Sequence, residues 1–184
     1  MLPRPIAWVS TQSLDGIDNL APFSFFNLFG VDPPVLGFAP GFKYPQGRAG
    51  GPVPKDTLRN VRDTGEFVVN LVHMGLVAKM NQTSADYPFA VSEFEAAGLT
   101  AARSTLVKPA RVKEALIALE CKLLQILELG RNNLVIGQIV GGHFADEIIK
   151  DGSVDLNCFE AVGRLGGDFY SSVKDRFELP RAKN

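Results

Sequence analysis

The sequence predicts a mainly β domain that is built from antiparallel strands and carries a few short helices. Apolar runs rich in β-branched and aromatic residues recur near the N-terminus, and glycine or proline separates them. The stretch from Leu116 to Phe144 has two strand-like halves around one polar turn, which is typical of a long hairpin. With 184 residues and 46% apolar side chains the chain can bury a substantial core, so we expect one domain over residues 1–184.

The first predicted strand runs from Ile6 to Thr11. Trp8 and Val9 favour extended backbone, and Arg4-Pro5 keeps the residues before the strand out of helix. Asp15-Gly16 follows as a turn, because glycine adopts positive φ without a steric cost. The opening segment therefore predicts an apolar hairpin.

The second strand of this hairpin is a run from Leu20 to Asn27. It ends before Asp32-Pro33-Pro34, because proline has no N–H to donate to a ladder, and Val35 to Ala39 is the next predicted strand. The segment from Gly41 to Pro54 is rich in glycine and proline and is expected to be an exposed, mobile loop. Its length fits a lid over a site or a plain insertion, and the sequence does not choose between them.

A short helix is predicted to start at Lys55-Asp56-Thr57, with Asp56 as the N-cap. The start of a helix carries free N–H groups and the positive end of the peptide dipoles, both of which favour phosphate. Lys55 adds a positive charge and Thr57 a hydroxyl donor. An ordinary capped surface helix has the same residues, so this triplet alone leaves both interpretations open.

The rest of the chain continues the mixed pattern. Glu66 to Leu71 predicts a strand, and Leu76 to Ser84 and Val91 to Gly98 predict short helical pieces. From Leu116 to Leu129 polar and apolar residues alternate until the pattern slips at Leu123-Leu124, as it does in a bulged strand. A turn at residues 130–133 then leads into a strand that ends at Phe144.

Composition excludes several classes of function. A formal net charge of −1 provides no basic surface for nucleic acid. The apolar runs are shorter than the roughly 20 residues of a membrane-spanning helix, and the first residues do not resemble a secretion signal. We therefore expect a cytoplasmic protein without nucleic-acid or membrane partners.

Cysteine and histidine are too scarce to predict a metal site. Cys121 and Cys158 lie in apolar, strand-like contexts without CxxC spacing, and both are expected to be buried free thiols. His73 and His143 are the only histidines. A zinc site needs more ligands at closer spacing, so we expect none.

Several segments occur in an order that resembles a known family. They are RPIAWVST, NLAPFSFFN, DPP, KDTLRN and TGEFVVNL. Together they are similar to the flavin reductase-like family of FMN-binding split-barrel proteins, which includes nitrilotriacetate monooxygenase component B and the flavoredoxins. The resemblance extends from Pro3 to about Tyr170. It implies an antiparallel Greek-key split barrel, a homodimer, and FMN, or FAD in its place, bound along the dimer interface.

The resemblance also implies a set of cofactor-binding residues. Around the ring edge and the ribityl chain they are Ser10, Thr11, Asn19 and Ser24, with Leu20, Ala21 and Pro22 facing the ring. Lys55, Asp56 and Thr57 are expected at the phosphate. Trp8 is expected in the core.

Two further residues complete the implied site. The segment GRLGGDFY looks like the family's R-x-G-G-x-x-Y motif, in which Arg164 would stabilise the electron-rich ring and Tyr170 would cover it or merely seal the barrel. His143 ends a strand, and its family counterpart lies near the flavin and the incoming nicotinamide. A structural hydrogen-bonding role is the alternative for this histidine.

The function implied by the resemblance is electron transfer from NAD(P)H through FMN to an acceptor such as a monooxygenase partner. Flavin performs the redox chemistry, so the protein supplies binding and orientation. One alternative is a flavoredoxin-like electron carrier without fast NAD(P)H turnover. Another is a binding module that uses the same crevice without redox chemistry.

Overall fold

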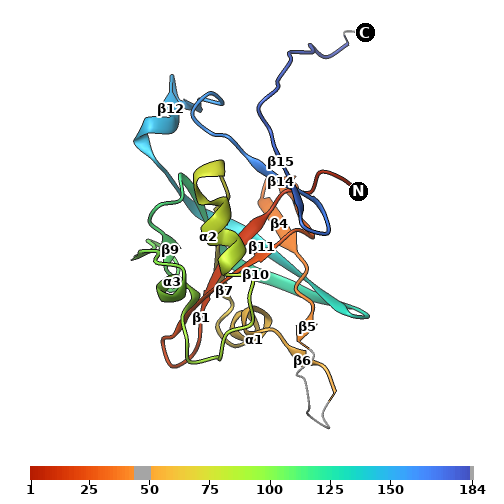
Figure 1. Ribbon diagram of the computed structural model, residues 1–184, viewed down its shortest axis with the longest axis vertical. Helices are drawn as coiled ribbons and strands as arrows, with labels where there is room; N and C mark the ends of the chain where they lie inside the picture. The colour runs from red at the N-terminus through yellow and green to blue at the C-terminus, as the bar shows by residue number, and fades with distance from the viewer. Residues whose placement is uncertain (44–50, 183–184) are drawn as a thin grey trace.

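Seven antiparallel strands form the central sheet of the computed structural model, which describes residues 1–43 and 51–182 (Figure 1). Their order across the sheet is β2-β1-β7-β10-β11-β4-β3. The strands are β1 (Ala7–Gln12), β2 (Asp18–Phe23), β3 (Phe26–Val31), β4 (Pro34–Phe38), β7 (Glu66–Leu71), β10 (Ile117–Leu129) and β11 (Asn132–Phe144). The mainly β prediction is confirmed.

The two edge strands of this sheet are neighbours in the sequence, because only Ser24 and Phe25 separate β2 from β3. So short a link brings the two edges of the sheet together and curls it into a barrel that is split between β2 and β3. The N–H of Ala39 donates to the carbonyl of Phe25 over 2.8 Å and holds this bend. The predicted single run from Leu20 to Asn27 is therefore wrong, since the bend divides it into two strands.

Strand β1 is buried almost throughout, because both of its faces are covered. Ala7 and Val9 point into the barrel and pack in the same cluster as Phe38. Ile6 and Trp8 point outward into a second apolar cluster, beneath the short helices. Trp8 is fully buried, as predicted, and its indole N–H donates to Thr83 Oγ1 over 2.9 Å. A strand covered on both sides loses the alternating pattern that a half-exposed strand shows.

Helix α1 (Asp56–Thr64) closes one end of the barrel. Its fully buried Leu58 and Val61 join the interior cluster. The helix ends at Gly65, whose φ of 71° is a left-handed conformation that glycine adopts at low cost. The prediction of Asp56 as N-cap is wrong: Lys55 occupies that position without a side-chain cap, and Asp56 is the first helical residue. The Asp56 carboxylate is instead held by basic side chains.

A second layer covers the outer face of β1 and β2. It contains η1 (Met74–Leu76), α2 (Val77–Gln82), α3 (Glu93–Ala96), β8 (Ala101–Ala102) and β9 (Arg111–Val112). Asn70 on β7 ties this layer to the sheet, because its amide donates to the Trp8 carbonyl at 3.0 Å and accepts from the Val112 N–H at 2.9 Å. The helical pieces predicted near residues 76–84 and 91–98 are confirmed.

Strands β10 and β11 form the predicted long hairpin. Register shifts between Glu120 and Cys121 and between Leu123 and Gln125 confirm the bulged strand. Burial raises the pKa of the Cys121 thiol, which is fully buried. Cys158 is exposed in a turn outside the sheet, so its predicted burial is wrong.

The remaining strands are short pairs at the periphery. They are β5 (Phe42–Lys43) with β6 (Val53–Pro54), β12 (Ile149–Lys150) with β13 (Ser153–Val154), and β14 (Val162–Gly166) with β15 (Phe169–Ser172), and η2 (Asp146–Ile148) precedes β12. The β5–β6 pair occupies both ends of the segment that was predicted as a mobile loop, and residues 44–50 lie outside the described residues. Within the described ranges, no helix is long and apolar enough to cross a bilayer.

We expect Gly137→Ala to destabilise the barrel. A Cβ at this position of β11 would lie 2.7 Å from Cε1 of Phe67, a fully buried ring that packs edge-on against Phe38. Overpacking of this kind costs about 1–3 kcal/mol in the free energy of unfolding, measured by urea denaturation. The control is Gly51→Ala, because a Cβ there meets no atom within 4 Å. Equal stability of the two variants would contradict the assigned packing.

Candidate functional site

A continuous groove runs along β2 and consists of two adjoining cavities. The first, the Lys55 cavity, has a volume of about 60 Å³ and lies at the start of α1. The second, the Arg164 cavity, has a volume of about 290 Å³ and lies beside β14. Pro22 and Ser84 line both cavities, which makes them one groove. Of the predicted site residues, the groove brings together Asn19, Ala21, Pro22, Ser24, Lys55, Asp56, Thr57 and Arg164.

The groove exists because β2 is an edge strand whose outer side cannot pair with a further strand. The outward N–H of Leu20 donates to Glu93 Oε2 over 2.8 Å and is thereby satisfied. Backbone groups two residues apart in a ladder point to the same side, so those of Pro22 also point outward, and proline has no N–H to donate there. The edge therefore stays free of a partner strand and presents its backbone to the groove.

The Lys55 cavity gathers donors for an anionic group. Thr57 is 1% exposed, and its hydroxyl accepts a hydrogen bond of 3.0 Å from the Asn19 amide, so its own proton can be donated elsewhere. The first N–H groups of α1 have no partner within the helix. Lys55 lines this cavity, and its ammonium lies 5.7 Å from the centre of the Phe23 ring. The small volume of the Lys55 cavity suits a single polar group.

Three carboxylates, those of Asp56, Asp86 and Glu93, also line the Lys55 cavity, and basic or backbone groups bind the first and the last of them. Asp56 forms ion pairs with Lys43 at 2.6 Å and with Arg59 at 2.7 Å. Burial raises the pKa of the Glu93 carboxyl, which the hydrogen bond from Leu20 partly offsets. The local negative charge is therefore smaller than the residue types suggest.

The Arg164 cavity combines basic and apolar walls. Ser24 Oγ accepts a hydrogen bond of 3.2 Å from Arg4 Nε. Arg164 donates to the Tyr170 hydroxyl, and its guanidinium carbon lies 4.5 Å from the centre of the Tyr170 ring. The apolar part of the wall comes from Ile6, Pro22, Phe23 and Met80.

Ser10 and Thr11 lie behind the groove, in the interior of the protein. Both side chains are fully buried on β1. The Ser10 hydroxyl donates to the Ala110 carbonyl at 2.5 Å, and the Thr11 hydroxyl accepts from the Asn60 amide at 3.1 Å. They support β2 from its paired side and do not line either cavity.

His143 is half-buried near the end of β11, where its backbone partner is Ala118 on β10. It does not line either cavity of the groove. His73 is also outside the groove, and its Nδ1 accepts from the Gly75 N–H at the start of η1. The structure therefore separates both histidines from the β2 groove of their own chain.

Several groove residues were not predicted from the sequence. They are Arg4, Lys43, Ser84 and Glu93. Arg4 stands directly before the first strand, and Ser84 belongs to the small polar segment after α2, which is the kind of signal that could have pointed to them. Lys43 and Glu93 come from distant segments, and only the fold brings them to β2.

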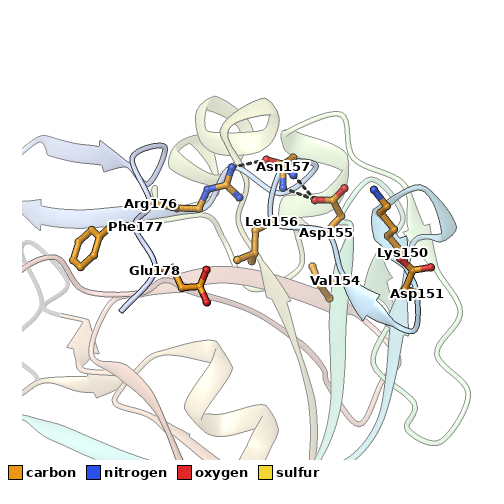
Figure 2. Close-up of a pocket in the computed structure, with 9 residues that line it drawn as sticks. All are labelled: Lys150, Asp151, Val154, Asp155, Leu156, Asn157, Arg176, Phe177 and Glu178. Carbon is orange, nitrogen blue, oxygen red and sulfur yellow. Dashed lines mark hydrogen bonds between the residues drawn. The ribbon is translucent and has the colours of Figure 1, made fainter. Parts of the chain in front are cut away.

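A larger cavity lies elsewhere, between the β12–β13 hairpin and the C-terminal tail (Figure 2). Its volume is about 580 Å³, and its walls include Lys150, Asp155 and Arg176. Figure 2 shows Arg176 bonded to Asn157, which in turn bonds Asp155. The backbone N–H of Asn157, and to a lesser extent its side-chain amide, donates to the Asp155 carboxylate and lowers the pKa of that carboxyl. The tail is exposed and extends away from the barrel (Figure 1), so this cavity is an open space beside it. None of the predicted site residues line it.

Comparison with known proteins identifies the family. Residues 1–157 match the model of the flavin reductase like domain. Nitrilotriacetate monooxygenase component B from Bacillus cereus is 34% identical in sequence, has a TM-score of 0.89, and covers 97% of this chain and 88% of its own. The 2-nitrobenzoate 2-nitroreductase of Pseudomonas fluorescens is also 34% identical, with a TM-score of 0.86 and coverage of 99% and 86%.

A more distant structure has the same fold. Flavoredoxin of Desulfovibrio vulgaris is 19% identical, with a TM-score of 0.82 over 97% of this chain and 91% of its own. The split barrel predicted from the ordered motifs is thus confirmed. On the match over residues 1–157 and the identity to solved relatives, the chain belongs to the flavin reductase-like family of split-barrel proteins.

Proposed function

We propose that this protein is an FMN-dependent oxidoreductase that takes electrons from NAD(P)H and passes them to a separate acceptor. The observation that carries the proposal is the β2 groove in a chain of the flavin reductase-like family. One end of the groove is a small cavity with cationic and helix-start donors, and the other is a wider cavity with apolar and aromatic walls. A long ligand with a phosphate and a flat ring fits this division.

The residues of the Lys55 cavity fit the phosphate. Lys55, the Thr57 hydroxyl and the free N–H groups at the start of α1 converge there as donors. Asp56 does not oppose an anion strongly, because Lys43 and Arg59 neutralise it. We propose that Lys55 and Thr57 hold the phosphate and that Asn19 orients the Thr57 hydroxyl through their 3.0 Å hydrogen bond.

The rest of the groove would receive the ribityl chain and the ring. Ala21 and Pro22 line the groove between its two ends, whereas Leu20, also predicted to face the ring, is fully buried on β2 and lines neither cavity. FMN, when bound, supplies hydride acceptance and onward electron transfer, so these residues need only bind it and limit water. Buried Ser10 and Thr11 would act indirectly, by fixing β1 behind β2.

The relatives suggest the kind of acceptor. The Bacillus cereus neighbour is named as component B of a monooxygenase, and the Pseudomonas fluorescens neighbour as a reductase of 2-nitrobenzoate. We therefore propose a monooxygenase component or a small organic compound as the acceptor here. A flavoredoxin-like carrier is the second candidate, supported by the shared fold alone.

We also propose that the protein is a homodimer. Strand β3 is a sheet edge with exposed apolar side chains, among them Leu28 at 51%, Phe29 at 61% and Val31 at 82% exposure. A long apolar edge left in water invites pairing with another chain. This edge adjoins the groove, because Arg4 and Ser24 line both the Arg164 cavity and the apolar hollow that contains Phe29. We propose that His143 acts at the groove of the second copy, because it lines neither cavity of its own chain.

We expect Lys55→Ala combined with Thr57→Ala to weaken FMN binding at least about tenfold, because charge-assisted hydrogen bonds to the phosphate are lost. Riboflavin, which has no phosphate, should bind both proteins equally. Fluorescence titration of the purified protein measures both affinities, with the exposed Lys174→Ala as the control variant. An equal loss for FMN and riboflavin would place the phosphate elsewhere.

Anaerobic mixing with NADH or NADPH tests the electron donor. We expect the absorbance of bound FMN to bleach rapidly with at least one of them, as stopped-flow spectroscopy would record. His143→Ala should slow this step and leave FMN affinity unchanged. Slow bleaching with both nucleotides, in a protein that does bind FMN, would favour the flavoredoxin-like carrier.

Phe29→Glu tests the proposed dimer. A carboxylate in the centre of the apolar β3 edge should shift the protein from dimer to monomer in light scattering coupled to size-exclusion chromatography. Leu14→Glu is the matched control, because Leu14 is 77% exposed in the β1–β2 turn and away from β3. A wild-type protein that is monomeric at all concentrations would refute the dimer.

A further inference from the structure

Two arginines from opposite ends of the chain pair directly through their backbones. The N–H of Arg4 donates to the carbonyl of Arg164 over 2.9 Å, and the N–H of Arg164 donates to the carbonyl of Arg4 over 2.9 Å. Residues that exchange both bonds in an antiparallel bridge stand opposite each other and project their side chains to the same face. The two guanidinium groups therefore share one side of this bridge.

The fold requires this close approach of the two segments. A Cβ at Gly163, the residue before Arg164, would lie 2.8 Å from the Cβ of Pro3, the residue before Arg4. Any larger side chain at position 163 would push the N-terminal segment away from β14. The bridge is thus built on a glycine that permits it.

No carboxylate neutralises this pair in the part of the chain that the structure describes. Neither Arg4 nor Arg164 has an acidic oxygen within the 4.0 Å of a salt bridge. Both side chains line the Arg164 cavity, whose walls contain neither aspartate nor glutamate. Like charges that stand opposite each other on a strand pair destabilise the fold, so their presence here calls for a compensating anion.

Both guanidinium groups are held in place before any ligand binds. Arg4 donates through Nε to Ser24, and its guanidinium carbon lies 5.6 Å from the centre of the Phe25 ring. Arg164 donates to the Tyr170 hydroxyl and to the Gly167 carbonyl. These bonds leave further N–H groups free on each side chain, because a guanidinium has more donors than they use.

We propose that Arg4 and Arg164 together bind the carboxylate of a small organic anion in the Arg164 cavity. Planar guanidinium groups match the two oxygens of a carboxylate. The ring of FMN and this anion would share the cavity. Without FMN the apolar wall of Ile6, Phe23 and Met80 would contact the body of the anion, and with FMN bound the body would lie against the ring. The role of this anion as the electron acceptor rests on the proposed function. Its binding to the two arginines does not. Arg164 then serves this second ligand and not the flavin ring.

Isothermal titration calorimetry with benzoate tests the proposal, on the protein alone and on the protein saturated with FMN. Benzamide, which has the same shape without the charge, is the matched ligand, and inorganic phosphate is the second anion. The variants are Arg4→Gln and Arg164→Gln, with Arg4→Lys and Arg164→Lys as conservative forms. Arg131→Gln is the control, because it removes one positive charge from the exposed β10–β11 turn.

We expect benzoate to bind with and without FMN, and benzamide to bind much more weakly. Each glutamine variant should lose at least about tenfold in benzoate affinity, each lysine variant should lose less, and Arg131→Gln should bind as the wild type does. FMN affinity should change by less than about threefold in the arginine variants. A urea-unfolding curve for each variant confirms that it is folded, and we expect Arg4→Gln to be at least as stable as the wild type.

Three outcomes would overturn the proposal. They are binding of phosphate in preference to benzoate, displacement of benzoate by FMN, and a loss of FMN affinity in the arginine variants that equals their loss of benzoate affinity. The last two would assign the arginines to the flavin. Failure of FMN to bind the wild-type protein would refute the proposed function instead, and the benzoate titration would still be read independently.

Discussion

The free outer edge of β2 is the constraint on which the rest of this structure depends. Glu93 satisfies the outward N–H of Leu20, and Pro22 has none to offer, so this part of the edge does not add another strand. The bend at Ser24-Phe25 then sends the chain across to the opposite edge of the sheet. The barrel consequently stays split, and the split is lined by backbone, hydroxyl and cationic groups. A closed barrel of the same strands would have no such groove.

Electrostatics divides the groove into two different ends. At the start of α1 positive and negative groups are mixed: Asp56 forms ion pairs with Lys43 and Arg59, and Lys55, Asp86 and Glu93 also line the cavity. Beside β14 the charged residues among those that line the wall are Arg4 and Arg164, both positive. The phosphate of one ligand suits the end at α1, and a second, separate anion suits the end at β14. A neutral molecule at β14 would leave the charges of the arginine pair uncompensated.

The local part of the site could be predicted from the sequence. Asn19, Pro22, Lys55 and Thr57 lie in the groove because turn, strand and helix-start signals act over a few residues. Ser10 and Thr11 were expected with them because the resemblance to the family implies hydroxyl groups around the ring edge and the ribityl chain. Their hydroxyls instead bond Ala110 and Asn60, since layers from distant segments bury both faces of that strand. Periodicity cannot reveal the outer layer that buries a strand's second face.

By itself the sequence determined most strands of the central sheet, the short helices, the bulge in β10 and the family, because these follow from local backbone preferences and ordered motifs. Only the tertiary structure decided that β2 and β3 are the two edges of the split, that Cys158 is exposed, and that Arg4 meets Arg164. These facts depend on contacts between residues far apart in the chain. Such contacts form when whole layers pack. The free energy that stabilises them comes from many segments together, so no short stretch of sequence predicts them.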